Sequence, residues 1–320
     1  MKMKLLRAGL WALCFFHGPA FADPLDAVGR PALPAPSLST PIPSGRIEIS
    51  TQAGQSAPTV LELFTSQGCS SCPPAESILN TWGLDLFEKG KLIPLAFHVD
   101  YWDNLGWKDP FDSPLFTGRQ QAYQFTLNNS SIYTPQMVVG GTREVAGANS
   151  QEAQYQAGLA SQAPSLTGLR LRILKQGNIL HLAVQISGLP YQDRHWQLMA
   201  AVFENGLKTH VAKGENAGAD LPEDFVVRSF TENAITGAGD PLFQNLDLPW
   251  DPSWNGMHAG VAVFLQNGAS LQIDSSAAVY PVLLAPEPPT PIPTASPTPI
   301  PEAPDRQETR EPTRFFPKGA

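Results

Sequence analysis

Two cysteines separated by two serines are the residues best suited to chemistry in this sequence. Cys69 and Cys72 lie in the stretch FTSQGCSSCPPAES, residues 64–77, and two prolines follow them directly. The only other cysteine of the chain is Cys14. A pair of this spacing can exchange electrons with other thiols, supply part of a metal site, or form a small structural disulfide.

A purely structural disulfide between these cysteines would stabilise the protein only weakly. Closing so short a loop removes little chain entropy, and the loop-closure expression gives about 2 kcal/mol. A disulfide between distant segments would close a longer loop and contribute more. We therefore favour a redox role and keep the structural role as an alternative.

The segments around the pair predict a strand before it and a helix after it. Residues 58–66, PTVLELFTS, are nearly all apolar, as in a strand that is buried on both faces. Pro73 and Pro74 suit the first turn of a helix that begins around Cys72. Unpaired N–H groups and the dipole at a helix N-terminus stabilise a thiolate. We expect Cys69 to be the nucleophile and Cys72 the buried resolving thiol.

The pattern of alternating strands and helices continues along the first half of the chain. The predicted elements are a helix over 73–90, a strand over 91–102, a helix over 113–129, a hairpin over 135–147 that turns at Gly140-Gly141, and a helix capped by Ser150. The resulting order, βαβαββα, is typical of an α/β sheet unit.

The second half of the chain shows strand patterns alone. Residues 166–187 alternate around a Gly177-Asn178 turn, and four further strand-like segments follow with turn residues between them. This pattern predicts an all-β, sandwich-like domain.

The two termini differ in composition from the rest. Residues 1–22 combine a basic start, a short apolar stretch that contains Cys14, and a small-residue cleavage site that ends at Ala22. No later segment is apolar enough to span a bilayer. The predicted organisation is a signal peptide over 1–22, a proline-rich linker over 23–57, an α/β domain over 58–163, a β-sandwich domain over 164–284 and a proline-rich disordered tail over 285–320.

The predicted signal peptide indicates a periplasmic or secreted protein, and the net charge limits the kinds of partner that it can bind. The formal net charge is −8, and removal of the basic leader makes the mature chain more acidic. An acidic exported protein is a poor candidate for binding nucleic acid or anionic lipid.

Several motifs together resemble a known fold and family. VLELFTSQGCSSC (60–72) and YTPQMVVGGTREVAG (133–147) make residues 58–163 similar to a thioredoxin-like domain. With FHVDYWDNLGWKDPF (97–111) and the β domain, the chain resembles a family of secreted bacterial proteins catalogued as a domain of unknown function. The resemblance implies that Pro135 is cis and faces the disulfide, and that the Thr134 backbone is offered to an extended substrate segment.

Glu62 is an acidic residue in an otherwise apolar predicted strand. By resemblance to the buried acid of thioredoxin, it is a candidate proton acceptor for Cys72. That acid lies six residues before its cysteine, whereas Glu62 lies seven before Cys69, so the resemblance requires a turn one residue longer. In the alternative, Glu62 faces outward or pairs with a neighbour, because burying an unpaired acid is costly.

The residues beside the pair suggest a substrate groove. Ser70 and Ser71 stand where thioredoxin has Gly-Pro and strong periplasmic oxidants have Pro-His. The sequence therefore leaves open whether the protein oxidises, reduces or isomerises disulfides. Tyr101, Trp102 and Trp107 follow the second strand and can form an apolar groove beside the disulfide. Equally, these aromatic side chains can pack the loop onto the body of the protein.

His98 ends the second predicted strand and raises the possibility of a metal site. Two thiols and one imidazole, from Cys69, Cys72 and His98, suit copper or zinc but leave the ligand shell incomplete. We therefore predict a thiol–disulfide oxidoreductase that acts on protein thiols or a redox partner protein and uses no cofactor besides the Cys69–Cys72 disulfide. The alternatives are a copper or zinc carrier and a non-enzymatic partner-binding module.

Overall fold

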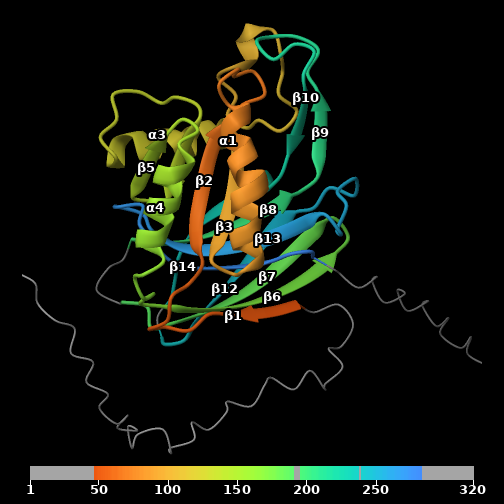
Figure 1. Ribbon diagram of the computed structural model, residues 1–320. Coiled ribbons are helices and arrows are strands. Elements are labelled where there is room, and N and C mark those ends of the chain that lie inside the picture. The colour runs from red at the N-terminus through yellow and green to blue at the C-terminus, as the bar shows by residue number, and fades with distance from the viewer. Residues whose placement is uncertain (1–46, 191–194, 238, 283–320) are drawn as a thin grey trace, which may run out of the picture. The chain divides into compact units, whose positions relative to one another are not determined.

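The computed structural model describes residues 47–190, 195–237 and 239–282 (Figure 1). The predicted signal peptide, the predicted tail and most of the predicted linker lie outside these residues. None of the described helices is long and apolar enough to cross a membrane.

A mixed eight-stranded sheet contains strands from both halves of the chain. In spatial order it consists of β14 (Ile273–Val279), β13 (Ala259–Asn267), β8 (Trp196–Glu204), β11 (Val226–Ala234), β3 (Leu92–His98), β2 (Thr59–Thr65), β4 (Gln136–Val139) and β5 (Arg143–Ala146). β2 is parallel to β3, while β4 is antiparallel to both β2 and β5.

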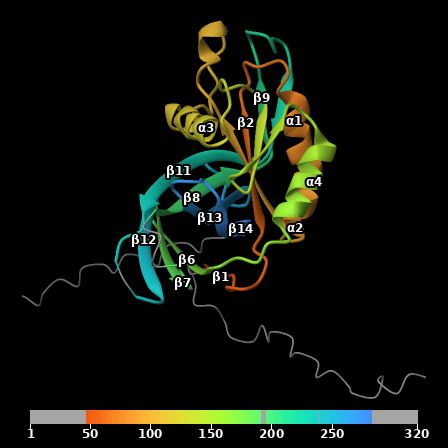
Figure 2. The same ribbon diagram turned by 90° about the vertical axis from the view of Figure 1, so that its left-hand side faces the viewer.

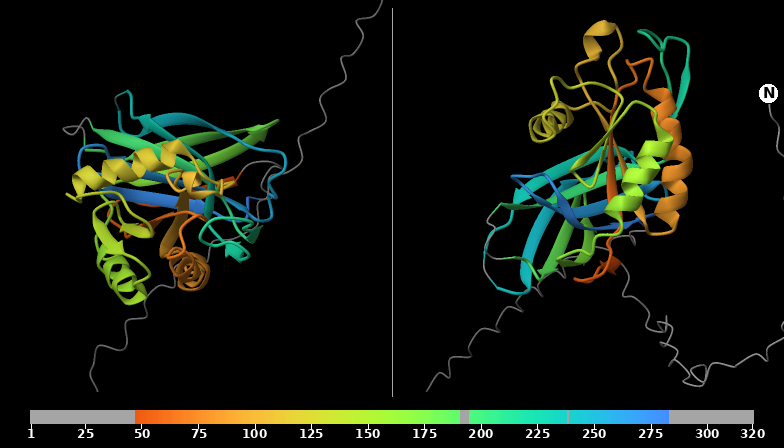
Figure 3. Two further views of the ribbon diagram at one scale, coloured as in Figure 1. Left: turned by 90° about the horizontal axis from the view of Figure 1, so that it is seen from above. Right: turned by 60° about the vertical axis from the view of Figure 1, so that its left-hand side comes forward.

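Helices cover both faces of the sheet around β2 and β3. The helical elements are α1 (Pro73–Ile78), a π-helical segment η1 (Leu79–Gly83), α2 (Leu84–Glu88), a 3-10 turn η2 (Asp103–Leu105), α3 (Pro114–Thr126) and α4 (Ser150–Ala160). α1, α2 and α4 lie on one side of the sheet and α3 on the other (Figures 2 and 3). Every residue of β2 and β3 is therefore buried, as the continuous apolar pattern predicts.

Alternation along β2 assigns its side chains to these two sides. Phe64 packs edge-on against Tyr123 of α3, with ring centroids 5.9 Å apart. Thr65 instead donates a hydrogen bond to Glu76 of α1. Glu62 shares the α3 side with Phe64, because the two residues are two positions apart.

Two local predictions around β5 have different outcomes. The β4–β5 hairpin turns at Gly140 and Gly141, whose φ angles are +59° and +77°, as predicted. A side chain at Gly141 would also collide with the backbone of Leu271, since its Cβ would lie 1.8 Å from that carbonyl oxygen. The predicted cap at Ser150 is wrong: the Asn149 side chain accepts from the Glu152 N–H, and Ser150 is the first helical residue.

A second sheet packs against the β-rich end of the first. Its order is β1 (Ile47–Ser50), β6 (Gly168–Gln176), β7 (Ile179–Ser187) and β12 (Leu242–Pro249). β8 is buried between two cores because alternate residues face opposite ways: Leu198 and Val202 contact the second sheet, while Met199 and Phe203 join the core beneath the helices.

β1 corrects the predicted extent of the linker. It lies within residues 23–57, yet it pairs with β6 as an edge strand. Ile49 packs against the core between the two sheets, so the short alternation in RIEIS is sufficient to form a strand.

The large sheet crosses the predicted domain boundary. That boundary falls between α4 and β6. β11 extends the sheet beside β3 through the parallel pair Val226 and Ala96, and the Ala96 N–H donates to the Phe225 carbonyl at 2.8 Å. The edge of β3 that would otherwise be exposed is thus paired by the second half of the chain.

A separate hairpin brings the second half of the chain close to the cysteines. β9 (Leu207–His210) and β10 (Asp220–Glu223) form a two-stranded sheet. Figure 1 shows this hairpin beside the N-terminal end of α1.

Candidate functional site

Cys69 and Cys72 lie in the turn between β2 and α1. Both are free thiols with no exposed surface. Cys72 is the residue that precedes α1, and Pro73 and Pro74 occupy the first helical positions, as predicted. The Cys72 N–H donates to the Cys69 carbonyl at 3.2 Å, which closes the turn.

Thr134 and Pro135 lie against this turn. Their peptide bond is cis, as the resemblance implied. Cys69 Sγ lies 3.9 Å from the Thr134 carbonyl oxygen and 3.3 Å from Ser71 Oγ. The first sulfur is therefore held between its own loop and the segment that opens β4.

The two thiols differ strongly in acidity. The Cys72 thiol, helped by hydrogen bonds from Ser71 and contacts to Thr134, lowers the pKa of Cys69 to about 6 although burial opposes this shift. Burial and the neighbouring Cys69 sulfur raise the pKa of Cys72 far above its ordinary value. The pair therefore favours one thiolate, on Cys69, and one thiol, on Cys72.

The predicted groove residues lie around the pair but differ in their contacts. Ser70 and Ser71 are exposed. Trp102 Nε1 donates to Thr134 Oγ1 at 2.9 Å, and the Thr134 carbonyl in turn lies beside Cys69. Trp107 Nε1 donates to Gln67 Oε1 at 3.0 Å, beside the turn.

Tyr101 is half-buried and packs against the main core. Burial, with a smaller contribution from the two thiols, raises its pKa to about 12. Tyr101 thus lies close to the sulfurs and Trp102 lies against Thr134, and a substrate groove formed by them stays a prediction.

The β9–β10 connection contacts the cysteine turn directly. The Glu215 carboxylate accepts hydrogen bonds from Ser70 N at 3.0 Å and Ser70 Oγ at 2.7 Å. Asn216 Nδ2 donates to the carbonyls of Gln67 and Cys69 at 2.9 and 3.0 Å. Local patterns do not predict these contacts, because they join residues about 150 positions apart.

Glu62 is not placed beside the cysteines. It is fully buried on the α3 side of β2, where Arg119 Nε lies 2.5 Å from one carboxylate oxygen. Tyr123 donates its hydroxyl hydrogen to the other oxygen. Of the two interpretations of Glu62, the structure shows pairing with neighbours and not a position beside Cys72.

Glu76, which sequence reasoning missed, is the buried acid on the side of the cysteines. It lies one helical turn after Cys72, and Thr65 Oγ1 donates to its carboxylate at 2.5 Å. Burial raises the pKa of Glu76 to about 7. The spacing of four from Cys72 was the available signal, since residues i and i+4 share one helix face.

His98 lies at the centre of a buried polar cluster next to Glu76. Its Nδ1 is 2.8 Å from Asp109 Oδ2, which also accepts from the Gln67 N–H at 2.8 Å. Its Nε2 is 4.0 Å from Glu223 Oε1. Burial alone would lower the pKa of His98, but Asp109 and Glu223 raise it to about 9.

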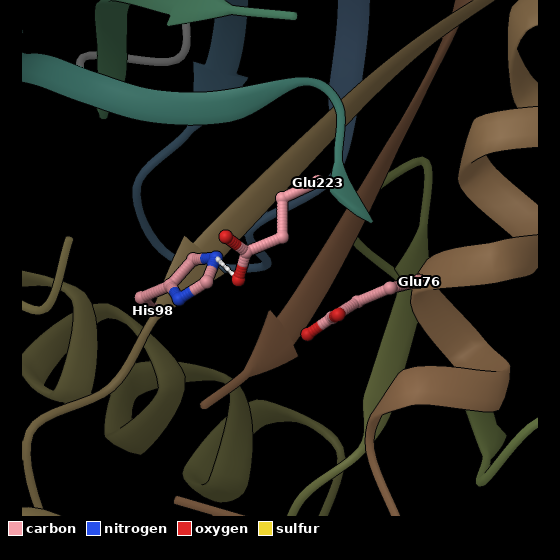
Figure 4. A group of neighbouring side chains, drawn as sticks. All are labelled: Glu76, His98 and Glu223. Carbon is pink, nitrogen blue, oxygen red and sulfur yellow. Dashed lines mark ion pairs between the residues drawn. The ribbon is translucent and has the colours of Figure 1, made fainter. Parts of the chain in front are cut away.

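The predicted copper or zinc set is not assembled. Within residues 47–282 as described, one group of His, Cys, Asp or Glu side chains has three ligand atoms within 4.8 Å of one another. It contains Glu76, His98 and Glu223 (Figure 4), and neither Cys69 nor Cys72. The His98 side chain is held by Asp109 and faces the two glutamates, so the cysteines are not its partners.

Comparisons with solved structures give two similar chains. The X-ray structure of protein AGR_C_4864 from Agrobacterium tumefaciens is 26% identical, with a TM-score of 0.51, over 71% of this chain and 96% of that one. HBP35 of Porphyromonas gingivalis is 16% identical, with a TM-score of 0.57, over 77% of this chain and 82% of that one. The second similarity concerns the fold alone.

Comparison with curated proteins gives no match. A family model matches residues 60–266, which is more than half of the chain and includes both cysteines and Glu76, His98 and Glu223. The chain therefore belongs to the family described as "Protein of unknown function (DUF1223)".

Proposed function

We propose that this protein is an exported, thioredoxin-like thiol–disulfide oxidoreductase in which Cys69 is the nucleophile and Cys72 the resolving thiol. The observation that carries the proposal is the position of the pair. Two free thiols precede α1, and Cys69 Sγ lies 3.9 Å from the Thr134 carbonyl at the start of β4. A low-pKa thiolate next to a protonated partner is the arrangement that disulfide exchange requires.

The exchange proceeds in two displacements. The Cys69 thiolate attacks one sulfur of a substrate disulfide, which forms a mixed disulfide and releases the other substrate sulfur as a thiolate. Cys72 gives its proton to that thiolate through solvent and then attacks Cys69 Sγ, which releases the second substrate thiolate. The dithiol thereby transfers two electrons to the substrate, and the reverse sequence oxidises a substrate dithiol.

The contacts around Cys69 favour the oxidising direction. Cys72, Ser71 and Thr134 stabilise a thiolate that exists only in the reduced protein. Stabilising the reduced form makes the corresponding disulfide a stronger oxidant. We therefore propose the oxidising direction, which the Ser70-Ser71 dipeptide alone left open.

Substrate recognition is assigned to the surface between the turn and β4. Ser70 and Ser71 are exposed there, and Trp102 is hydrogen-bonded to Thr134. An extended segment of a protein substrate would lie along Thr134 and Pro135. Because Cys69 has no exposed surface, the turn at Ser70 and Ser71 must shift before a substrate disulfide reaches its sulfur. The basic, apolar leader at 1–22 supports action outside the cytoplasm, where disulfides persist.

Trapping of mixed disulfides tests the proposal. In Cys72→Ser the first displacement can occur and the second cannot, so covalent, reductant-sensitive adducts with substrate proteins should accumulate. Cys69→Ser is the matched control, because it keeps one thiol at the site but removes the nucleophile. Adducts with Cys72→Ser alone support the proposal, whereas equal adducts with both variants, or none with either folded variant, contradict it.

A further inference from the structure

We propose that Glu76, His98 and Glu223 form a binding site for a divalent transition-metal ion such as Zn²⁺. The three side chains come from α1, β3 and β10 and have 5%, 0% and 2% of their surface exposed. One ligand atom from each lies within 4.8 Å of the others. Figure 4 shows the imidazole and both carboxylates pointing toward one another.

The free nitrogen of His98 points to a ligand. Asp109 Oδ2, an acceptor, lies 2.8 Å from Nδ1, so Nδ1 keeps its proton, and an ion that binds would displace the proton of Nε2 and take that lone pair. Nε2 is buried and has no hydrogen-bond partner in the described structure, since Glu223 Oε1 is 4.0 Å away. Buried polar atoms are almost always paired, and a metal ion would supply the missing partner.

The hydrogen bonds made to the three candidate ligands are of the kind usually found around metal-binding side chains. A histidine that binds a metal usually donates its other N–H to a carboxylate, as His98 does to Asp109. Gln67 Nε2 lies 2.9 Å from both oxygens of Glu223, and Thr65 Oγ1 lies 2.5 Å from Glu76. Both carboxylates are thus held in place while lone pairs stay available.

The ligand types indicate the class of ion. One imidazole and two carboxylates give three protein ligands and two negative charges, which match a divalent cation. Mg²⁺ and Ca²⁺ take oxygen ligands, so the imidazole favours a first-row transition ion, and Zn²⁺ commonly has three protein ligands with a fourth position for another group. Bound there, the ion would link the β9–β10 hairpin to α1 one turn after Cys72.

The site does not depend on the proposed thiol chemistry and can be tested without it. The full chain carrying Cys14→Ser, Cys69→Ser and Cys72→Ser has no thiols, which would bind zinc themselves. Because the site is buried, the metal-free protein is refolded with Zn²⁺, desalted and analysed by elemental mass spectrometry. We expect about one zinc ion per chain, since a preformed buried site holds its ion through desalting.

Substitutions on this background locate the ion. Glu76→Gln should abolish retention, and Asp109→Asn, which keeps the ligands but weakens their orientation, should reduce affinity by about 10- to 100-fold. His181→Gln is the control, because His181 is partly exposed on β7 of the second sheet and, in the described structure, pairs with Asp247 of β12. It should leave zinc retention unchanged.

Three outcomes overturn the proposal: no zinc in the refolded thiol-free parent, equal zinc in Glu76→Gln, or loss in His181→Gln. If Glu76→Gln does not fold, X-ray absorption at the zinc edge of the parent decides the question. A shell of nitrogen and oxygen ligands that includes one imidazole supports the site. A shell without imidazole contradicts it.

Discussion

Two buried polar clusters lie on opposite sides of β2, and they differ in charge balance. On the α3 side, Glu62 is paired with Arg119 at 2.5 Å, and the guanidinium also contacts Glu232 and Gln266 at 3.2 Å. On the α1 side, Glu76, Glu223 and Asp109 surround the imidazole of His98, whose Nε2 has no hydrogen-bond partner among the described residues.

The difference separates a structural group from a candidate functional one. A buried charge that is matched and hydrogen-bonded stabilises one packing arrangement, and its removal leaves an uncompensated partner. A buried cluster with excess carboxylates and a free nitrogen has capacity for a ligand. The second cluster is also the one that adjoins the thiols, because Thr65 contacts both Glu76 and Cys72.

Removing the cation of the charge-balanced cluster around Glu62 and Arg119 should have the largest effect, a loss of folding stability. Arg119→Met leaves the Glu62 carboxylate buried without its cation, and we expect the free energy of unfolding to fall by about 3–5 kcal/mol. Chemical denaturation of the full chain measures the change. Lys89→Met is the control: it removes an exposed ion pair with Asp85, both side chains being 56% exposed, and should cost less than about 1 kcal/mol. Equal losses in the two variants would refute the structural role of Arg119.

On the side of β2 that carries the thiols, Cys69 should lose its proton at moderate pH. Because the pKa of Cys69 is lowered to about 6, its thiolate is the minor form below that pH and the major form above it. The ultraviolet absorbance of thiolate should show one group gained with a midpoint near pH 6 and no second group through pH 8, since Cys72 stays protonated. An absorbance that begins to rise only above pH 8 would mean that neither thiol is activated.

Loosening the contact between the β9–β10 connection and the cysteine turn should have a smaller effect. Glu215→Gln weakens two exposed hydrogen bonds to Ser70, and we expect the reaction of Cys69 with a small disulfide to change by about two- to fivefold. Asp224→Asn is the control, since its side chain accepts only from the Gly206 N–H among the bonds described. A change of a hundredfold would instead make Glu215 part of the reacting group.

The smallest effect on thiol chemistry should come from Glu62. Glu62→Gln should destabilise the protein, because it removes the charge that pairs with Arg119, but leave the exchange rate within about twofold. A tenfold slower exchange in a folded variant would restore the catalytic role for Glu62 that its place in the sequence suggested.

The features that could be predicted from the sequence are those determined by residues close together in the chain. The helix start after Cys72 follows from two prolines and an apolar strand before them, and the turn at Gly140-Gly141 from two glycines. Both depend on residues close together in the chain. The position of Thr134 against Cys69 required a resemblance, because the two residues are 65 positions apart.

The misplacement of Glu62 has a simple geometric cause. Side chains alternate along a strand, so a shift of one residue moves an acid from one side of the sheet to the other. The acid of thioredoxin lies six residues before its cysteine, and Glu62 lies seven before Cys69. This difference of one residue puts Glu62 on the opposite side of the strand, toward α3. Glu76 could have been found from its helical spacing to Cys72.

Glu223 was beyond the reach of local patterns. It approaches His98 only because β11 pairs with β3 across the predicted domain boundary and carries the β9–β10 hairpin with it. A single register pair, Val226 with Ala96, fixes this junction, and no periodicity within either half specifies it.

The reduction potential of the Cys69–Cys72 pair decides whether this pair exchanges disulfides with other proteins. The full chain is equilibrated in glutathione buffers of graded ratio, quenched in acid, alkylated and weighed by mass spectrometry. A pair that exchanges disulfides should have a potential between about −270 and −120 mV. A potential below about −300 mV, with Cys69 unreactive toward small disulfides, would rule out the proposed exchange and identify the pair as a structural disulfide.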